Sequence, residues 1–260
     1  MSERRKDHAM HRILLEACCG SARDVRLADI AGADRMELNT ALALGGLTPS
    51  AGELEQARAA TCRPILVMVR PREGDFRYDP DALATMAADI RILGRTGADG
   101  FVFGCLTEDA RVDTEAMRRL LDAADGKPCV FHRALDLVPD WKRALDTLMA
   151  LGVTRVLTSG QKPTAWAGRH TLQAMRRYAG DQLEILPGGG IRPGLGHALV
   201  SETGCTQLHL SGRRQIVPAR AANPDGIALG TPGQAEDGQY GELDPDVFIR
   251  LRHELEAETI

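Results

Sequence analysis

The sequence has no long apolar run and little excess charge, and each absence argues against a class of partner. No run approaches the roughly 20 apolar residues that span a bilayer, so no membrane-spanning helix is expected. The formal net charge is −4 at pH 7, which gives no indication of nucleic acid or an anionic membrane as a partner. Residues 1–12 are charged and lack the apolar centre of a signal peptide, which predicts a disordered leader on a cytoplasmic protein.

Paired cysteine motifs are missing as well. The chain has six cysteines, and none of them forms a Cys-x-x-Cys pair. Without an export signal, the cysteines of a 260-residue chain are expected to be free thiols. The spacing therefore gives no support to a zinc ribbon or a thioredoxin-like redox pair.

The sequence does contain one device four times: a glycine, a polar residue soon after it, and a short apolar strand. The copies begin at Gly32, Gly97, Gly152 and Gly204. A periodic apolar stretch precedes each glycine, as is typical of a glycine at the C-terminus of a helix. The copies lie about 50–65 residues apart, enough for two strands and two helices. Four such quarters predict an α/β fold with eight parallel strands, closed into a TIM (β/α)8 barrel.

Short apolar strands and helical stretches alternate along residues 13–260, which we interpret as a single barrel domain. The expected strands are 13–18, 36–38, 64–70, 101–103, 127–132, 156–157, 183–187 and 208–210. The expected helices are 22–31, 51–60, 80–94, 114–124, 141–151, 165–178, 195–202 and 245–256. Ser21, Asp79 and Asp140 are typical N-cap residues. A doubly wound open sheet is the alternative, but no G-x-G-x-x-G motif follows the first strand.

One stretch interrupts this alternation. Residues 213–244 follow the eighth strand, are rich in Gly, Pro, Ala and Asp, and show weak periodicity. The segment is long for a connection between a strand and a helix. We interpret it as a long loop, which is either a surface loop or oligomer arm, or a lid over an active site.

Polar side chains at the C-terminal ends of barrel strands face a shared pocket. Five of them are candidate catalytic residues: Glu16, Glu37, Arg70, His132 and Asp136. Two carboxylates, a histidine and an arginine in one barrel mouth are costly to bury unless they are paired. Two interpretations stay open. The residues perform acid–base chemistry on a ligand, or they form a polar plug in which Arg70 and His132 neutralise the two glutamates.

The loops after the seventh and eighth expected strands are rich in glycine. The candidate anion-binding residues in them are Gly188, Gly189, Gly190, Arg192, Ser211 and Gly212. Glycine exposes backbone N–H groups, and these two loops commonly hold a phosphate in barrels of this kind. The N-terminus of the following helix adds positive potential. The loops therefore favour an anion site over their other interpretation, which is ordinary strand exits.

Cys18 and Cys105 stand at strand ends and are the candidate metal ligands. Thiolates are the soft ligands that copper(I) prefers. Strand alternation places Cys18 on the same side as Glu16, and Asn39 on the same side as Glu37. The alternative is that both cysteines are buried and inert, because no helical His-x-x-x-His or Cys-x-x-Cys signature accompanies them.

Several blocks of sequence occur in a familiar order. They are residues 15–18, 32–38, 45–50, 68–72, 74–76, 102–106, 131–134, 156–161 and 187–190. Together they resemble the copper homeostasis protein CutC family over roughly residues 13–213, and several blocks are far more specific than one motif. The resemblance implies a TIM barrel, a cytoplasmic location, a homodimer or higher homo-oligomer, and a role in copper homeostasis.

The resemblance also implies copper(I) as the bound cofactor. The cysteines linked to copper in relatives follow Glu in the first strand and Glu-Leu in the second. Cys18 matches the first position, and Asn39 stands at the second. We therefore expect a protein of copper homeostasis that binds copper. The alternative is a barrel enzyme or sensor for a small phosphorylated or carboxylated metabolite, in which the glycine loops hold the anion. There, acid–base chemistry would come from Glu16, Glu37 and His132.

Overall fold

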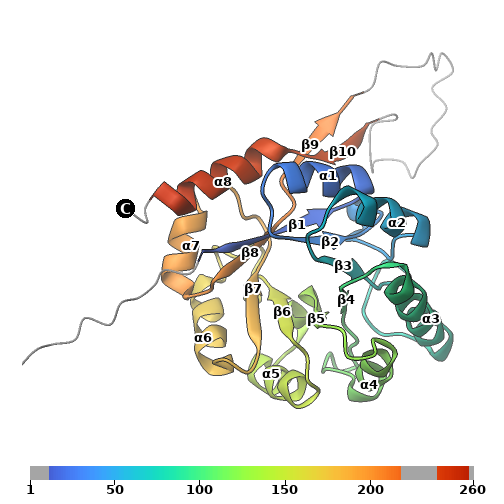
Figure 1. The fold of residues 1–260 in the computed structure, drawn as a ribbon. Coiled ribbons are helices and arrows are strands. Elements are labelled where there is room, and N and C mark those ends of the chain that lie inside the picture. The colour runs from blue at the N-terminus through green and yellow to red at the C-terminus, as the bar shows by residue number, and fades with distance from the viewer. Residues whose placement is uncertain (1–11, 218–238, 258–260) are drawn as a thin grey trace, which may run out of the picture.

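Eight parallel strands curl into a barrel in the structure, a computed structural model that describes residues 12–217 and 239–257 (Figure 1). The strands are β1 (Leu14–Cys19), β2 (Arg35–Leu38), β3 (Ile65–Met68), β4 (Gly100–Phe103), β5 (Cys129–Phe131), β6 (Arg155–Thr158), β7 (Glu184–Pro187) and β8 (Gln207–Leu210). Their order is β7-β6-β5-β4-β3-β2-β1-β8, and a parallel bridge between Gly188 and His209 links the two ends of the sheet. The predicted TIM-barrel fold is confirmed.

Helices surround the strands on the outside of the barrel (Figure 1). They are α1 (Ala22–Ile30), α2 (Ala51–Ala60), α3 (Pro80–Thr96), α4 (Thr114–Ala123), α5 (Trp141–Ala150), α6 (Arg169–Ala179), α7 (Gly196–Thr203) and α8 (Pro245–Ala257). Two short 3₁₀ turns, η1 (Leu42–Leu44) and η2 (Arg133–Leu137), follow β2 and β5. Among the helices of residues 12–217 and 239–257, none combines the length and the apolar character that a membrane span requires.

The predicted helix-capping residues cap helices in the structure. The side chains of Ser21, Asp79 and Asp140 accept hydrogen bonds from the first-turn N–H groups of α1, α3 and α5. The four repeated glycines have φ values of +79°, +118°, +75° and +69°, in the left-handed region that ends a helix. Helix α6 begins at Arg169, four residues later than predicted, and turns occupy residues 165–168. The Ala165 N–H donates to the Gly189 carbonyl of the neighbouring loop (2.9 Å).

The inside of the barrel contains an apolar cluster and a charged half. Strands β3 to β7 contribute the apolar cluster, which consists of Leu66, Met68, Val102, Val130, Leu157 and Leu186. A separate, larger apolar layer packs the outer faces of the strands against the helices. The charged half consists of the buried ionisable side chains of β1, β2 and β8, and Arg155 of β6, which is also buried, lies close enough to lower the pKa of Glu16.

Glu16 is the centre of the charged half. It is 1% exposed, and the strand register sets it opposite Arg35 of β2 and His209 of β8. The Arg35 guanidinium donates to Glu16 Oε2 and to Gln207 Oε1, while His209 Nδ1 lies 2.8 Å from Glu16 Oε1. The polar-plug interpretation was wrong about the partners of Glu16. They come from the two strands that are hydrogen-bonded to β1, because side chains at one level of a barrel meet their lateral neighbours.

The segment predicted as a loop over 213–244 contains two strands at its ends. They are β9 (Arg213–Ile216) and β10 (Tyr240–Leu243), which pair antiparallel and lie beside α1 (Figure 1). Residues 218–238 of this segment, and residues 1–11 of the predicted leader, lie outside the described residues.

Glu16→Gln is expected to lower the free energy of unfolding by about 3–5 kcal/mol, because it leaves Arg35 buried without its counter-charge. Urea denaturation at pH 7 measures the change. The matched control is Glu202→Gln, which breaks a partly exposed ion pair with Arg169 and is expected to cost less than about 1 kcal/mol. Similar costs for the two variants would contradict the special position of Glu16.

Candidate functional site

Three potential metal-ligating side chains meet at the C-terminal mouth of the barrel. The thiol of Cys18, the carboxylate of Glu37 and the imidazole of His209 each place one ligand atom within 4.8 Å of the others. Cys18 Sγ lies 3.8 Å from Glu37 Oε1. They come from β1, β2 and β8, and within the described residues they form the one group of three or more such side chains at metal-binding distance. We call them the Cys18–Glu37–His209 cluster.

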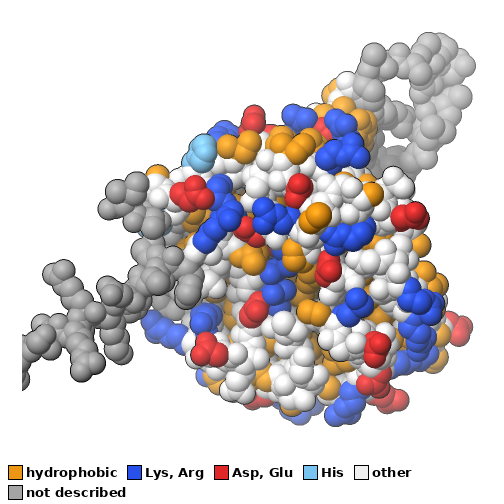
Figure 2. Space-filling model, viewed as in Figure 1, with side chains coloured by type: hydrophobic (Ala, Val, Ile, Leu, Met, Phe, Trp, Pro, Cys, Tyr) orange, Lys and Arg blue, Asp and Glu red, His pale blue; other side chains and the backbone are white. Residues whose placement is uncertain are grey.

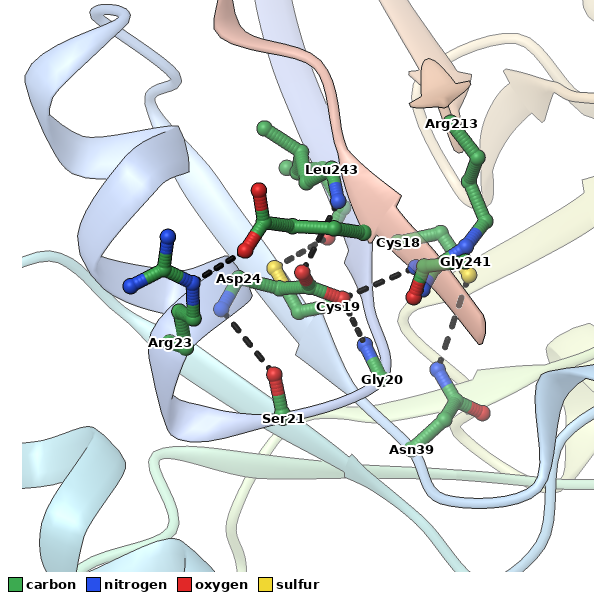
Figure 3. Close-up of polar contacts among 12 residues, drawn as sticks. Cys18, Cys19, Gly20, Ser21, Arg23, Asp24, Asn39, Arg213, Gly241 and Leu243 are labelled. Atoms are coloured by element: carbon green, nitrogen blue, oxygen red, sulfur yellow. Dashed lines mark hydrogen bonds and ion pairs between the residues drawn. The ribbon is translucent and has the colours of Figure 1, made fainter. Parts of the chain in front are cut away.

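Asn39 completes the surroundings of this cluster. Its Nδ2 donates to Glu37 Oε1 (2.9 Å) and to Cys18 Sγ (3.6 Å), a contact drawn in Figure 3. The predicted alternation is therefore confirmed, because Glu37 of β2 and Asn39, which follows the strand, both contact Cys18. The Asn39 amide thus contacts both the sulfur and the carboxylate of the cluster.

The charges of the cluster are set by its neighbours. Burial would raise the pKa of Glu16, but Arg35 and His209 hold it at about 2, so this carboxylate stays ionised. Burial would lower the pKa of His209, but Glu37, Cys18 and Glu16 raise it well above its ordinary value, which keeps the imidazole protonated. Burial raises the pKa of Glu37, against the opposing charge of His209. His209 of the cluster is thus protonated, and it lies between the ionised Glu16 and Glu37, whose pKa is raised.

The thiols of Cys18, Cys19 and Cys105 lie in different surroundings. Burial raises the pKa of Cys18 to about 11, so its thiol is protonated in the resting protein. The next residue, Cys19, points to the other face of β1, where its thiol contacts the Ala17 carbonyl at 3.6 Å. Cys105 is not a member of the cluster. It lies in the larger apolar layer, and burial raises its pKa to about 12. The structure therefore brings one of the two candidate metal-ligating cysteines to the other ligands.

His132 and Arg70 both contact Phe76 and do not belong to the Cys18–Glu37–His209 cluster. The Phe76 ring lies 4.6 Å from the His132 ring and 5.1 Å from Arg70 Cζ. Burial, together with the nearby charge of Arg70, lowers the pKa of His132 to about 3, so the imidazole is neutral. Neither residue pairs with Glu16 or Glu37 by an ion pair or a hydrogen bond within the described part of the chain.

The Asp136 carboxylate connects two segments of the chain by hydrogen bonds. Its carboxylate accepts hydrogen bonds from Thr158 Oγ1 (2.5 Å), from the N–H and hydroxyl of Ser159, and from the Gln161 N–H, and it pairs with Arg133 (2.8 Å). These contacts tie η2 to the loop after β6. The carboxylate predicted to be catalytic is thus occupied in holding two loops together.

The glycine loops lie side by side, as the bridge between Gly188 and His209 shows. The N-terminus of α7, which was expected to add positive potential for an anion, already has an internal partner. The Glu254 carboxylate of α8 accepts hydrogen bonds from the Gly194 N–H (2.6 Å) and the His197 N–H (3.0 Å). Arg192 and Ser211 are exposed, and the Gly212 carbonyl accepts from the Asp244 N–H (2.6 Å). An anion there would have to compete with Glu254 for this helix end.

Asp24 fixes the loop that follows Cys18. Its carboxylate accepts from the Gly20 N–H (2.8 Å), from Arg213 Nη1 (2.8 Å) and from the Leu243 N–H (2.9 Å) (Figure 3). One buried carboxylate thereby joins the end of β1 to both strands of the β9–β10 pair. The two strands within the predicted loop consequently brace the metal-ligand side of the mouth.

His209 was not among the residues predicted for the site. The available signal was a single ionisable side chain between Leu208 and Leu210 in a buried strand. Arg35 was missed because the expected strand began one residue later, at Met36. Outside the mouth, Figure 2 shows positive and negative side chains interspersed over the viewed face, in agreement with the small net charge.

Comparison with known proteins identifies relatives. The model of the CutC family matches residues 13–214. A CutC family protein of Treponema denticola is 44% identical over 216 residues, which cover 83% of this chain and 88% of that protein. The human copper homeostasis protein cutC homolog is 40% identical over 225 residues, 86% of this chain and 82% of that one. The crystal structure of a Streptococcus agalactiae protein described as the copper homeostasis protein CutC has 36% identity and a TM-score of 0.74, over 76% of this chain and 98% of that chain.

The lowered pKa of His132 predicts acid sensitivity. Below pH 6.5 the unfolded chain binds a proton at this residue that the folded protein does not take up until about pH 3, so stability falls as the pH decreases. The loss from this group reaches about 2 kcal/mol at pH 5. His132→Asn keeps an acceptor near the Ala134 N–H and is expected to remove that loss in urea denaturation at pH 7 and pH 5. His253→Asn, at an exposed position of α8, is the matched control. An unchanged pH dependence in His132→Asn would show that another group dominates.

Proposed function

Because the chain belongs to the CutC family, we propose that it takes part in copper homeostasis and that it binds copper(I) at Cys18. The observation that carries the proposal is the Cys18–Glu37–His209 cluster, whose ligand atoms lie within 4.8 Å of one another. A thiolate and an imidazole are ligands that suit copper(I). The six cysteines are free, which agrees with action in the reducing cytoplasm. The expected homodimer or higher assembly stays a prediction.

The surroundings of His209 fit a ligand role. Its Nδ1 is held by Glu16 at 2.8 Å, which leaves Nε2 as the nitrogen for the Cys18 side of the ring. Carboxylate–histidine pairs of this kind fix the ring orientation and make the other nitrogen a better ligand. Copper(I), as the cargo, would displace the protons of the Cys18 thiol and of Nε2. Glu37, with a raised pKa, stands beside both groups and would accept one of these protons, while the other would pass to solvent.

A barrel enzyme or sensor for a small anionic metabolite is the second candidate function. Glu16 is committed to ion pairs, Asp136 is fully hydrogen-bonded, and His132 stays neutral over the physiological range. Glu37 is the remaining acid–base candidate of the predicted set, because its pKa is raised and its Oε2 has no partner among the described residues. This oxygen is the observation that favours the second candidate.

Cys18→Ser is expected to weaken copper(I) binding by at least about 100-fold, since it removes the only thiol of the cluster. The experiment is an anaerobic competition titration of reduced protein with a chromophoric copper(I) chelator. The Cys18→Ser variant and the reference protein with Cys18 intact both carry Cys62→Ser, because Cys62 is exposed and would bind copper(I) adventitiously. Cys105→Ser in the same background is the matched control and should leave the affinity unchanged. Equal affinity with and without the Cys18 thiol would rule out this site.

Asn39→Cys is expected to raise the copper(I) affinity about tenfold or more, because it adds a second thiol where the amide now lies 3.6 Å from Cys18 Sγ. The same competition titration measures it. Asn39→Ser, which removes the amide without adding a soft ligand, separates the gain of sulfur from the loss of the hydrogen bond to Glu37. A gain of the same size in Asn39→Ser would contradict the role given to sulfur.

A further inference from the structure

We propose that the mouth of the barrel contains a second binding site, for a small oxyanion, formed by Arg70, Tyr78 and His132. This site is separate from the Cys18–Glu37–His209 cluster and does not depend on copper. It also differs from the anion site that the glycine loops had suggested. The oxyanion is a carboxylate or a phosphate ester, two groups that the same donors recognise.

The proposal begins with buried polar atoms that have no partner. Within the described residues, five buried side-chain nitrogen or oxygen atoms lack a hydrogen bond, and they belong to Glu37, Arg70, Tyr78, His132 and Arg252. Three of the five, Arg70 Nε, the Tyr78 hydroxyl and His132 Nε2, are hydrogen-bond donors. The Phe76 ring contacts both Arg70 and His132, and the charge of Arg70 acts on the pKa of His132 and of Tyr78, so the three side chains are neighbours. Native proteins rarely leave such groups unsatisfied, and a bound molecule with acceptor atoms would satisfy all three donors together.

Arg70 supplies the charge. It is 6% exposed, and its terminal nitrogens donate only to backbone carbonyls: Nη1 to Leu44 (2.9 Å) and Gly46 (3.2 Å), and Nη2 to Gly74 (2.9 Å). No carboxylate lies within ion-pair distance of this guanidinium in residues 12–217 and 239–257. A buried cation without a counter-charge is unfavourable, and an anionic ligand at Nε would supply that charge.

His132 supplies a neutral donor, and the structure fixes which nitrogen carries the proton. The Ala134 N–H donates to His132 Nδ1 at 3.3 Å, so the proton of the neutral ring resides on Nε2. Gly104, which follows β4, leaves room for the His132 ring. A Cβ at residue 104 would lie 2.7 Å from His132 Nδ1 and Cε1. The ring is thereby held with an N–H donor that no group among the described residues accepts.

Tyr78 adds a third donor from the loop after β3. Burial raises the pKa of its hydroxyl to about 12, so the group stays protonated and able to donate. The hydroxyl lies close to the Arg70 guanidinium, whose charge opposes that rise. One cationic N–H, one neutral N–H and one O–H make a donor-only set with a single positive charge. That set suits an oxyanion and gives a metal cation no ligand.

An open groove runs past Arg70. It has a volume of about 520 Å³, and its lining includes Arg70, Thr48 and Pro71 as well as the carboxylates of Glu53 and Asp89. Tyr78 and His132 do not line this groove, so it gives solvent access on the Arg70 side of the proposed site only.

The experiment titrates reduced protein separately with sodium acetate and with inorganic phosphate, against sodium chloride at matched ionic strength. Binding is followed by thermal shift and by the ¹⁵N–¹H resonance of His132 Nε2 in histidine-labelled protein. The expected result is a saturable rise in melting temperature with one of the two probes, and slower solvent exchange of the Nε2 proton. A response to acetate assigns the site to carboxylates, and a response to phosphate assigns it to phosphate esters. No saturable response to either probe would overturn the proposal.

Variants separate this site from its surroundings. Tyr78→Phe removes only the hydroxyl and is expected to weaken binding of the responding probe about tenfold, the effect of one hydrogen bond to a charged group. Arg72→Met is the matched control, because Arg72 belongs to the same loop and stacks on Tyr78 from the exposed side. Cys18→Ser should bind the probe normally while losing copper(I), so that the copper proposal and this one fail independently. Unchanged binding in both Tyr78→Phe and His132→Asn would refute the assignment to these residues.

Discussion

The barrel depends on keeping Glu16, Arg35 and His209 together. A carboxylate that is 1% exposed stays ionised only when opposite charges reach it, and each of its two partners comes from a different neighbouring strand. Keeping Glu16 ionised therefore requires a particular strand order as well as favourable charge interactions. Strand β1 must lie between β2 and β8, in the register that sets residue 16 level with residues 35 and 209. Any slip of one residue would turn a charged side chain into the apolar layer behind the sheet.

The same constraint shapes the site. By holding Nδ1 of His209, Glu16 turns the remaining nitrogen towards Cys18, and the raised pKa of His209 follows from the negative groups around it. Strands β3 to β7 contribute a cluster of apolar side chains, although β6 also carries the buried Arg155. The ionisable side chains of β1, β2 and β8 are where this interior differs most from a barrel filled with apolar side chains.

The sequence allowed the fold to be predicted more fully than the site. Repeated glycines, caps and short apolar strands are local signals, and they located the eight strands and helices, with the largest difference at the start of α6. The partners of Glu16 were predicted wrongly because they depend on which strands are neighbours after closure, and on a register that no local pattern records. The occupation of the α7 N-terminus by Glu254 is a contact across 60 residues at Gly194, so a glycine-rich loop looked open when its helix end was not. His209 was visible only as an isolated polar residue.

One loop joins the two proposed chemistries at the barrel mouth. Gly46, with φ at +87°, lies against the Asn39 amide on one side, while its carbonyl accepts from Arg70 Nη1 on the other. A Cβ at residue 46 would lie 2.4 Å from Asn39 Oδ1, so the loop approaches the amide more closely than any other residue type permits. Asn39 in turn donates to both Cys18 and Glu37. The position of this loop therefore fixes the amide beside the thiol and the guanidinium beside Phe76 at once. The proposed metal site and the proposed anion site therefore both depend on the position of this loop, although no residue is a ligand in both.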